Sequence, residues 1–238
     1  MVEKTLQGKA GLQLSGNVLK ILAAISMTVD HAGLMLFPKL SALRFVGRLA
    51  FPIFAFMIAE GCVHTRSRVR YFLSVLALAV VCQTAYTVAM DSWYLCAPVS
   101  FSLAIPLVLA LESWKKAKAP LSKFGWAAVF LGGVASVWIL TQITQLDYGF
   151  WGCMLPVGAS LFRTTKRWDK NTFHVLAMAV FMVPLAVAMG QWQWWSFLSL
   201  PLLKVYSGRR GKYKMKYFFY IFYPAHLLVI QGINMLIT

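Results

Sequence analysis

The chain has 238 residues, of which 60% are hydrophobic and only 13% are charged, and its formal net charge is +16. Soluble domains average about 25% charged residues, and a mean hydropathy of +0.68 excludes a soluble globular protein. No long polar segment is present to form a second unit, so we expect a single integral-membrane domain over residues 1–238.

Apolar runs predict an all-α, polytopic membrane protein with about nine transmembrane helices. A spanning helix needs about 20 mostly apolar residues, because the hydrocarbon core is about 30 Å thick. The sixth, seventh and eighth runs are short, so one of them can be re-entrant or fused with a neighbour. In chain order the runs are 18–37, 43–63, 69–90, 93–111, 124–144, 148–163, 173–189, 191–205 and 216–237.

The positive charges predict a cytoplasmic N-terminus and a C-terminus on the other side. Cytoplasmic loops of membrane proteins are enriched in Lys and Arg. With this orientation, 19 of the 23 Lys and Arg residues lie on the cytoplasmic side, and only Lys39 lies in an opposite loop. Topology therefore explains the basic charge, and we expect the lipid bilayer, and no nucleic acid, as a partner.

The four cysteines do not have the CxxC spacing of a metal site. We expect them to fill space as small apolar residues, and we expect no metal. They are Cys62, Cys82, Cys96 and Cys153.

The first predicted helix, "VLKILAAISMTVDHAGLMLF", carries Lys20, Asp30 and His31. Ionisable groups inside a bilayer are costly and indicate functional sites. Lys20 and His31 are eleven residues apart and share one helix face, whereas Asp30 points about a quarter-turn away. A His can exchange a proton near neutral pH, which suits a general base. Taken alone, such a His is more often part of a helix–helix hydrogen bond.

The second predicted helix places Arg48 at the depth of Asp30, and a short loop joins the two helices. An Asp30–Arg48 ion pair would lower the cost of burying both charges, whether it only holds the helices together or also serves a site. Pro52 is expected to kink this helix and to free a carbonyl.

The segment "HTRSRVR" follows the second helix and contains His64, Arg66 and Arg68. It fits a positive-inside anchor, and it fits equally a cytoplasmic site for a phosphorylated cofactor, because Arg side chains bind phosphate oxygens bidentately. In the last predicted helix, "FFYIFYPAHLLVI", Pro224 is expected to break the helix just before His226, which lies at about the depth of His31.

Together these stretches resemble the TraX family of membrane proteins, named for the conjugative-pilus pilin acetylase. They are similar, more distantly, to the acyltransferase-3 and heparan glucosaminide acetyltransferase families, in which a basic residue opens the first helix and a His follows about three turns later. Lys20 and His31 occupy those places, although acyltransferase-3 proteins usually have Arg at the first. The resembling blocks cover roughly a quarter to a third of the chain and are "LKILAAISMTVDHAG", "GRLAFPIFAFMIAEG" with "HTRSR", "FFYIFYPAHLLVI" and, more weakly, "YGFWGC".

The resemblance implies a multi-pass acetyltransferase of the bacterial inner membrane. Cytoplasmic acetyl-CoA would donate the acetyl group, and the acceptor would be an extracytoplasmic amine or hydroxyl, on a protein amino terminus, a glycan or an amino sugar. His31 would be the base, Asp30 would orient it or pair with Arg48, His226 would shuttle a proton or hold the thioester carbonyl, and Arg48 would contact the oxyanion. The CoA-binding residues would be Lys20, His64, Arg66 and Arg68.

Two other functions remain open at this point. The polar cluster also fits the proton relay of a transporter or flippase, although the inverted pair of broken helices found in many transporters is not evident. It fits, further, a non-catalytic assembly protein that uses the cluster for packing. The Arg-rich stretch separates these functions, because an acetyltransferase needs it for CoA and a proton-coupled carrier does not.

Overall fold

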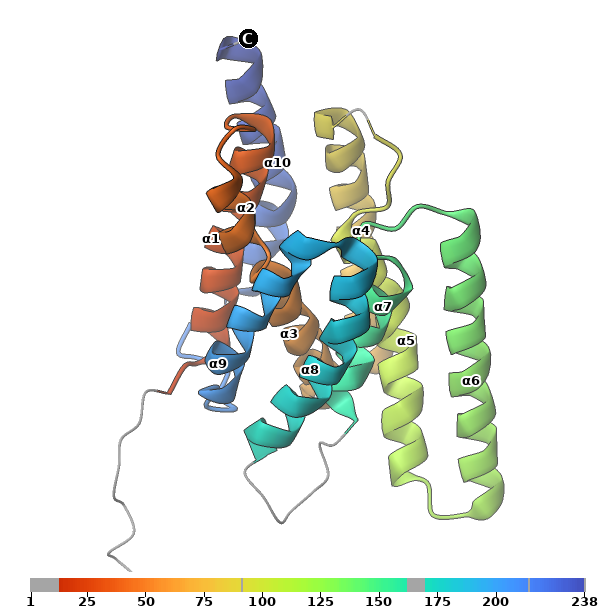
Figure 1. Ribbon diagram of the computed structural model, residues 1–238. Helices are drawn as coiled ribbons and strands as arrows, with labels where there is room; N and C mark the ends of the chain where they lie inside the picture. Colours follow the sequence, from red (N-terminus) through yellow and green to blue (C-terminus); the bar gives the residue numbers. More distant parts are fainter. Residues whose placement is uncertain (1–12, 91, 162–169, 214, 238) are drawn as a thin grey trace, which may run out of the picture.

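The protein is a bundle of helices with no β-strand in the ranges that the computed structural model describes, which are residues 13–90, 92–161, 170–213 and 215–237 (Figure 1). The predicted all-α fold is confirmed for these ranges. Within these ranges, seven helical segments are long and apolar enough to cross a membrane. They are α1 (Gly16–Met35), the α2–α3 pair (Ser41–Gly47 and Ala50–His64), α4 (Arg68–Met90), α5 (Ala97–Lys116), α6 (Pro120–Ile143), α8 (Lys170–Met189) and α10 (Lys216–Ile237).

Two further segments are shorter. The helix α7 (Gly149–Ser160) has 12 residues and a length of only ~18 Å. The second segment joins η1 (Gln191–Leu198), a 3₁₀-helix, to α9 (Ser199–Lys204). The prediction of one α-helix over 191–205 is therefore wrong in its first half. A 3₁₀-helix rises about 2.0 Å per residue, so η1 and α9 together extend ~25 Å. The count of nine spans and their orientation stay predictions.

The second predicted span is broken into α2 and α3 at Arg48 and Leu49. Pro52 lies in the first turn of α3 and has no N–H for the carbonyl of Arg48. The hydroxyl of Ser26 on α1 donates to the carbonyls of Val46 and Gly47 at the end of α2. The kink expected of Pro52 is thus present as a two-residue interruption, in which Arg48 and Leu49 keep helical backbone angles. It places Arg48 at a corner facing α1.

The last helix, α10, runs without interruption through Pro224, so the predicted break before His226 is wrong. A proline inside a helix removes one hydrogen bond, here to the carbonyl of Tyr220. Helices packed among neighbours tolerate that loss, and α10 packs against both α1 and α4.

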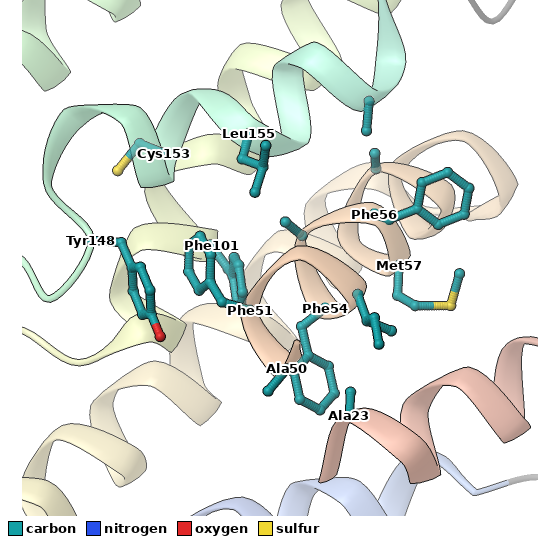
Figure 2. Close-up of a cluster of buried hydrophobic side chains, with 14 of the residues drawn as sticks. Ala23, Ala50, Phe51, Phe54, Phe56, Met57, Phe101, Tyr148, Cys153 and Leu155 are labelled. Carbon is teal, nitrogen blue, oxygen red and sulfur yellow. The ribbon is translucent and has the colours of Figure 1, made fainter. Parts of the chain in front are cut away.

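The core surrounds α3, which packs against α1, α5 and α7. Figure 2 shows its aromatic side chains: Phe51 lies between Phe101 of α5 and Tyr148, which precedes α7. The rings of Phe51 and Tyr148 are stacked, with centroids 3.6 Å apart. All four cysteines are buried and none forms a disulfide, as expected of apolar filler residues.

Candidate functional site

A buried ion pair joins α1 to the corner between α2 and α3. Nη2 of Arg48 lies 3.0 Å and 2.9 Å from the two carboxylate oxygens of Asp30, and each residue is 8% exposed. The predicted Asp30–Arg48 pair is confirmed. Sequence reasoning missed a second cation: Nη1 of Arg44 lies 3.4 Å from the same carboxylate. The carboxylate of Asp30 is therefore held by two arginines.

Gly47 makes this arrangement possible. A Cβ atom at this position would lie 2.2 Å from Cβ of Asp30, which is far inside any van der Waals contact. Because only a glycine fits there, α2 approaches α1 closely enough for both arginines to reach Asp30.

The second polar contact joins α1 to α10. Nδ1 of His31 lies 2.9 Å from Nε2 of His226, and Nδ1 of His226 lies 3.0 Å from the carbonyl oxygen of Phe222. A carbonyl only accepts, so Nδ1 of His226 carries a proton and its Nε2 is the acceptor when the ring is neutral. Nδ1 of His31 must then donate, which leaves Nε2 of His31 with a free lone pair. Asp30 and His31 thus have different partners, as their directions on the helix predicted.

His31 and the ion pair line the same cavity, whose volume is about 180 Å³. One water molecule requires about 10–15 Å³, so the cavity admits a small polar group as well as water. Tyr223 of α10 and Phe101 of α5 contribute apolar surface to its wall. Its polar wall contains Asp30, His31, Arg44, Arg48, Asp147 and Tyr148.

Asp147 and Tyr148 also line this cavity, and sequence reasoning did not assign them to the site. They precede α7, and the isolated bridge between Leu95 and Leu146 holds the backbone beside them. Burial raises the pKa of Asp147 to about 6, and Arg48 acts in the opposite direction. Burial also raises the pKa of Tyr148, so its hydroxyl stays protonated. The weakly resembling block "YGFWGC" begins next to Asp147 and was the one available signal.

The residues expected to bind CoA lie outside this cavity. Nζ of Lys20 lies 6.0 Å from the ring centroid of Phe219 on α10, so Lys20 and His31 face the same helix, as predicted. Nη1 of Arg68 donates to the hydroxyl of Ser113 on α5 at 2.8 Å. Lys20 and Arg68 therefore contact different helices. His64 and Arg66 are exposed at the junction of α3 and α4.

Comparison with known proteins relates almost the whole chain to one family. The family model described as "TraX protein" matches residues 15–234. A probable fimbrial assembly protein FimC, serogroup H1, of Dichelobacter nodosus is 24% identical over 94% of this chain and 97% of its own length. An uncharacterized protein, RP591, of Rickettsia prowazekii (strain Madrid E) is 52% identical over 40 residues, which are 17% of this chain and 16% of that protein. No solved structure matches the chain.

Proposed function

The chain belongs to the TraX protein family, and from that premise we propose that it is a membrane-bound acetyltransferase. It moves an acetyl group from cytoplasmic acetyl-CoA to an amine or hydroxyl acceptor at or beyond the membrane. The observation that carries this proposal is the hydrogen bond from His31 to His226, which leaves Nε2 of His31 as a free base on the wall of a polar cavity.

His31 acts as the general base in this proposal. Its Nε2 takes a proton from the acceptor, whose nitrogen or oxygen then forms a bond to the acetyl carbon. The C–S bond breaks and the sulfur leaves as a thiolate, which takes up a proton. The bond to His226 fixes the tautomer and orientation of His31 and stabilises the imidazolium that forms, as the third member of a catalytic triad does.

Arg48 supplies the oxyanion contact. Its Nη2 donates to both carboxylate oxygens of Asp30. Its buried Nε has no hydrogen-bond partner among the described residues. A buried donor without a partner is costly, and one beside a reacting carbonyl stabilises the charge that develops on the oxygen. Asp30 then acts as a positioning residue that holds the guanidinium in place.

We assign the CoA phosphates to the basic residues Lys20, His64, Arg66 and Arg68. His64, Arg66 and Arg68 are exposed where α3 ends and α4 begins, and Arg side chains match phosphate oxygens in geometry and charge. Lys20 and His31 both face α10. The boundary between α1 and α10 therefore runs from Lys20, one of the residues assigned to the CoA phosphates, to the catalytic base His31.

We further propose nine crossings of the bacterial inner membrane, with the N-terminus in the cytoplasm and the C-terminus outside. The shorter α7 and the η1–α9 segment would be the two crossings beyond the seven long ones. In Figure 1 the chain alternates between the two ends of the bundle, and α10 ends at the end opposite to the start of α1. Three exposed tryptophans of η1, at positions 192, 194 and 195, suit a membrane–water interface.

The decisive test uses the purified protein in lipid nanodiscs. Acetyl-CoA binding is measured by calorimetry, and acetyl-CoA consumption is measured for wild type, His31→Ala and a Ser136→Ala control on the exposed helix α6. We expect binding by all three proteins and turnover by wild type and the control alone. If no CoA compound binds at millimolar concentration, the enzyme proposal is wrong. Full turnover by His31→Ala would refute the base assignment and leave the reaction class intact.

A further inference from the structure

Asp147 has a carboxylate that the mechanism above does not use. The side chain lines the cavity with His31 and Arg48, and no hydrogen bond or ion pair to its carboxylate is present among the described residues. Both arginines of the cavity are bonded to the other carboxylate, that of Asp30. The side chain is half-buried, so its carboxylate is accessible from the cavity to water or to a ligand.

The backbone around Asp147 holds the carboxylate in place. Its N–H donates to the carbonyl of Leu95 at 2.9 Å, and the N–H of Leu95 donates to the carbonyl of Gln145 at 2.8 Å. The next residue, Tyr148, stacks on Phe51. Gly149 has a φ of +54°, a left-handed conformation that glycine adopts most easily. These hydrogen bonds and the ring stacking therefore hold the turn that carries Asp147 in one conformation.

The charges around Asp147 come from every element that lines this side of the cavity. Arg44 and Arg48 lie at the corner of α2 and α3, Asp30 and His31 lie on α1, and the hydroxyls of Tyr86, Tyr148 and Tyr223 come from α4, the turn and α10. With Asp30 ionised and His31 neutral, the side chains carry one positive charge in excess unless Asp147 is also ionised. An ionised Asp147 therefore makes the summed charge of these side chains zero.

Proton counting separates the two kinds of acceptor. A hydroxyl that is acetylated by a thioester loses one proton, and the thiolate takes it up, so one base is sufficient. A primary amine is an ammonium ion at neutral pH and must lose two protons, of which the thiolate takes up only one. An amine acceptor therefore requires a second proton acceptor, and His31 alone does not provide it.

On the basis of the proposed acetyltransferase function, we propose that Asp147 binds the ammonium group of a primary-amine acceptor and takes its first proton. The ammonium becomes a neutral amine, and its nitrogen attacks the acetyl carbon. His31 takes the second proton through Nε2, the C–S bond breaks, and the thiolate receives the proton from His31. Asp147 releases the first proton to water, so each turnover yields an amide, CoA and one proton.

The ionisation of Asp147 is matched to this task. Its raised pKa of about 6 makes the carboxylate a stronger proton acceptor than an ordinary aspartate, while it remains mostly ionised at neutral pH. A general base works best when its pKa lies near the working pH. The ammonium ion also gives the carboxylate of Asp147 a charged hydrogen-bond donor.

The test measures binding of a matched pair of probes, n-butylammonium and 1-butanol, to the full-length protein in nanodiscs without CoA. Ligand-induced shifts of the unfolding temperature across a concentration series give the two affinities. The proteins are wild type, Asp147→Asn, Asp147→Glu and Gln145→Ala, the last as a control on an exposed side chain in the same turn. We expect Asp147→Asn to weaken n-butylammonium by about tenfold, the loss of one charged hydrogen bond, and to leave 1-butanol unchanged. Asp147→Glu and Gln145→Ala should prefer the ammonium ion as wild type does.

Two outcomes would overturn the role of Asp147. One is wild-type affinity of Asp147→Asn for n-butylammonium, and the other is a wild-type protein that does not prefer the ammonium ion to the alcohol. The experiment contains no CoA, so it fails independently of the acetyltransferase proposal. If acetyl-CoA does not bind but ammonium selectivity depends on Asp147, then only the reaction class is wrong.

Discussion

Nδ1 of His31 and Nε2 of His226 lie 2.9 Å apart, although 195 residues separate them in the chain. The bond links the first and last described helices, and the carbonyl of Phe222 determines which nitrogen carries each proton. The same carbonyl therefore determines which nitrogen of His31 is free to act as a base. The hydrogen bond that joins α1 to α10 therefore also fixes the protonation of the proposed base.

Replacement of His226 tests whether its hydrogen bond orients His31 for catalysis. We expect His31→Ala to lower acetyl transfer by about 10²–10⁴-fold, the usual contribution of a general base. His226→Gln, whose amide oxygen can accept the bond from His31, should lose much less than His226→Ala. Rates of acetyl-CoA consumption at saturating substrate provide the measurement. Equal losses in the Gln and Ala variants would show that the hydrogen bond does not orient His31.

Gly47→Ala should destabilise the protein through the ion pair. The new Cβ would overlap Asp30, so α2 must move away from α1, and such overpacking typically costs about 1–3 kcal/mol. Gly132→Ala on α6 is the matched control, because a Cβ there meets nothing within 4 Å. Thermal unfolding in detergent compares the two variants. An unchanged unfolding temperature for Gly47→Ala would contradict the close approach of α2.

The free energy of unfolding should fall more when one partner of the Asp30–Arg48 pair is replaced than when both are replaced. Asp30→Asn leaves a buried guanidinium without its counter-ion, which typically costs about 3–5 kcal/mol. The double variant Asp30→Asn with Arg48→Gln removes both charges and should recover part of that loss. A double-mutant cycle on unfolding free energies measures the coupling. Additive effects would mean that the two side chains do not interact.

Asp147 predicts a specific pH dependence of stability. Burial raises the pKa of its carboxyl to about 6 in the folded protein, from about 3.9 in the unfolded chain. Between these values the folded protein holds more protons than the unfolded chain. The contribution of Asp147 to stability is therefore complete below about pH 4, falls as the pH rises to about 6, and is constant above that pH. Asp147→Asn should remove this decline and stabilise the protein by about 1–3 kcal/mol at pH 7. Unfolding curves at pH 4 and pH 7 check this, and a larger gain at pH 4 would contradict it.

The nine-crossing topology makes a prediction that needs no assay of activity. A periplasm-active reporter fused after residue 237 should be active, and one fused between α5 and α6, near Lys118, should be inactive. Reporters active only in the cytoplasm should show the reverse. If the C-terminal fusion is cytoplasmic, then the number of crossings is even, and either α7 or the η1–α9 segment does not cross.

The amino-acid sequence by itself determined the membrane class, the helical fold and the location of most ionisable groups in the apolar runs. Hydropathy is a sum over neighbouring residues, so Lys20, Asp30, His31, Arg48 and His226 are visible as exceptions inside apolar stretches. The pairing of Asp30 with Arg48 was predictable as well, because a short connection makes their helices antiparallel neighbours and equal depth brings the side chains together.

Only the tertiary structure decided the contacts between distant segments. Asp147 follows α6 in the chain, and its place beside Arg48 depends on the packing of α3 against α7. The helix is interrupted just before Pro52 but continues through Pro224. The neighbouring helices determine whether the hydrogen bond lost at a proline is tolerated. Local sequence specifies which groups are costly to bury, whereas the packing of distant helices specifies which partner offsets that cost.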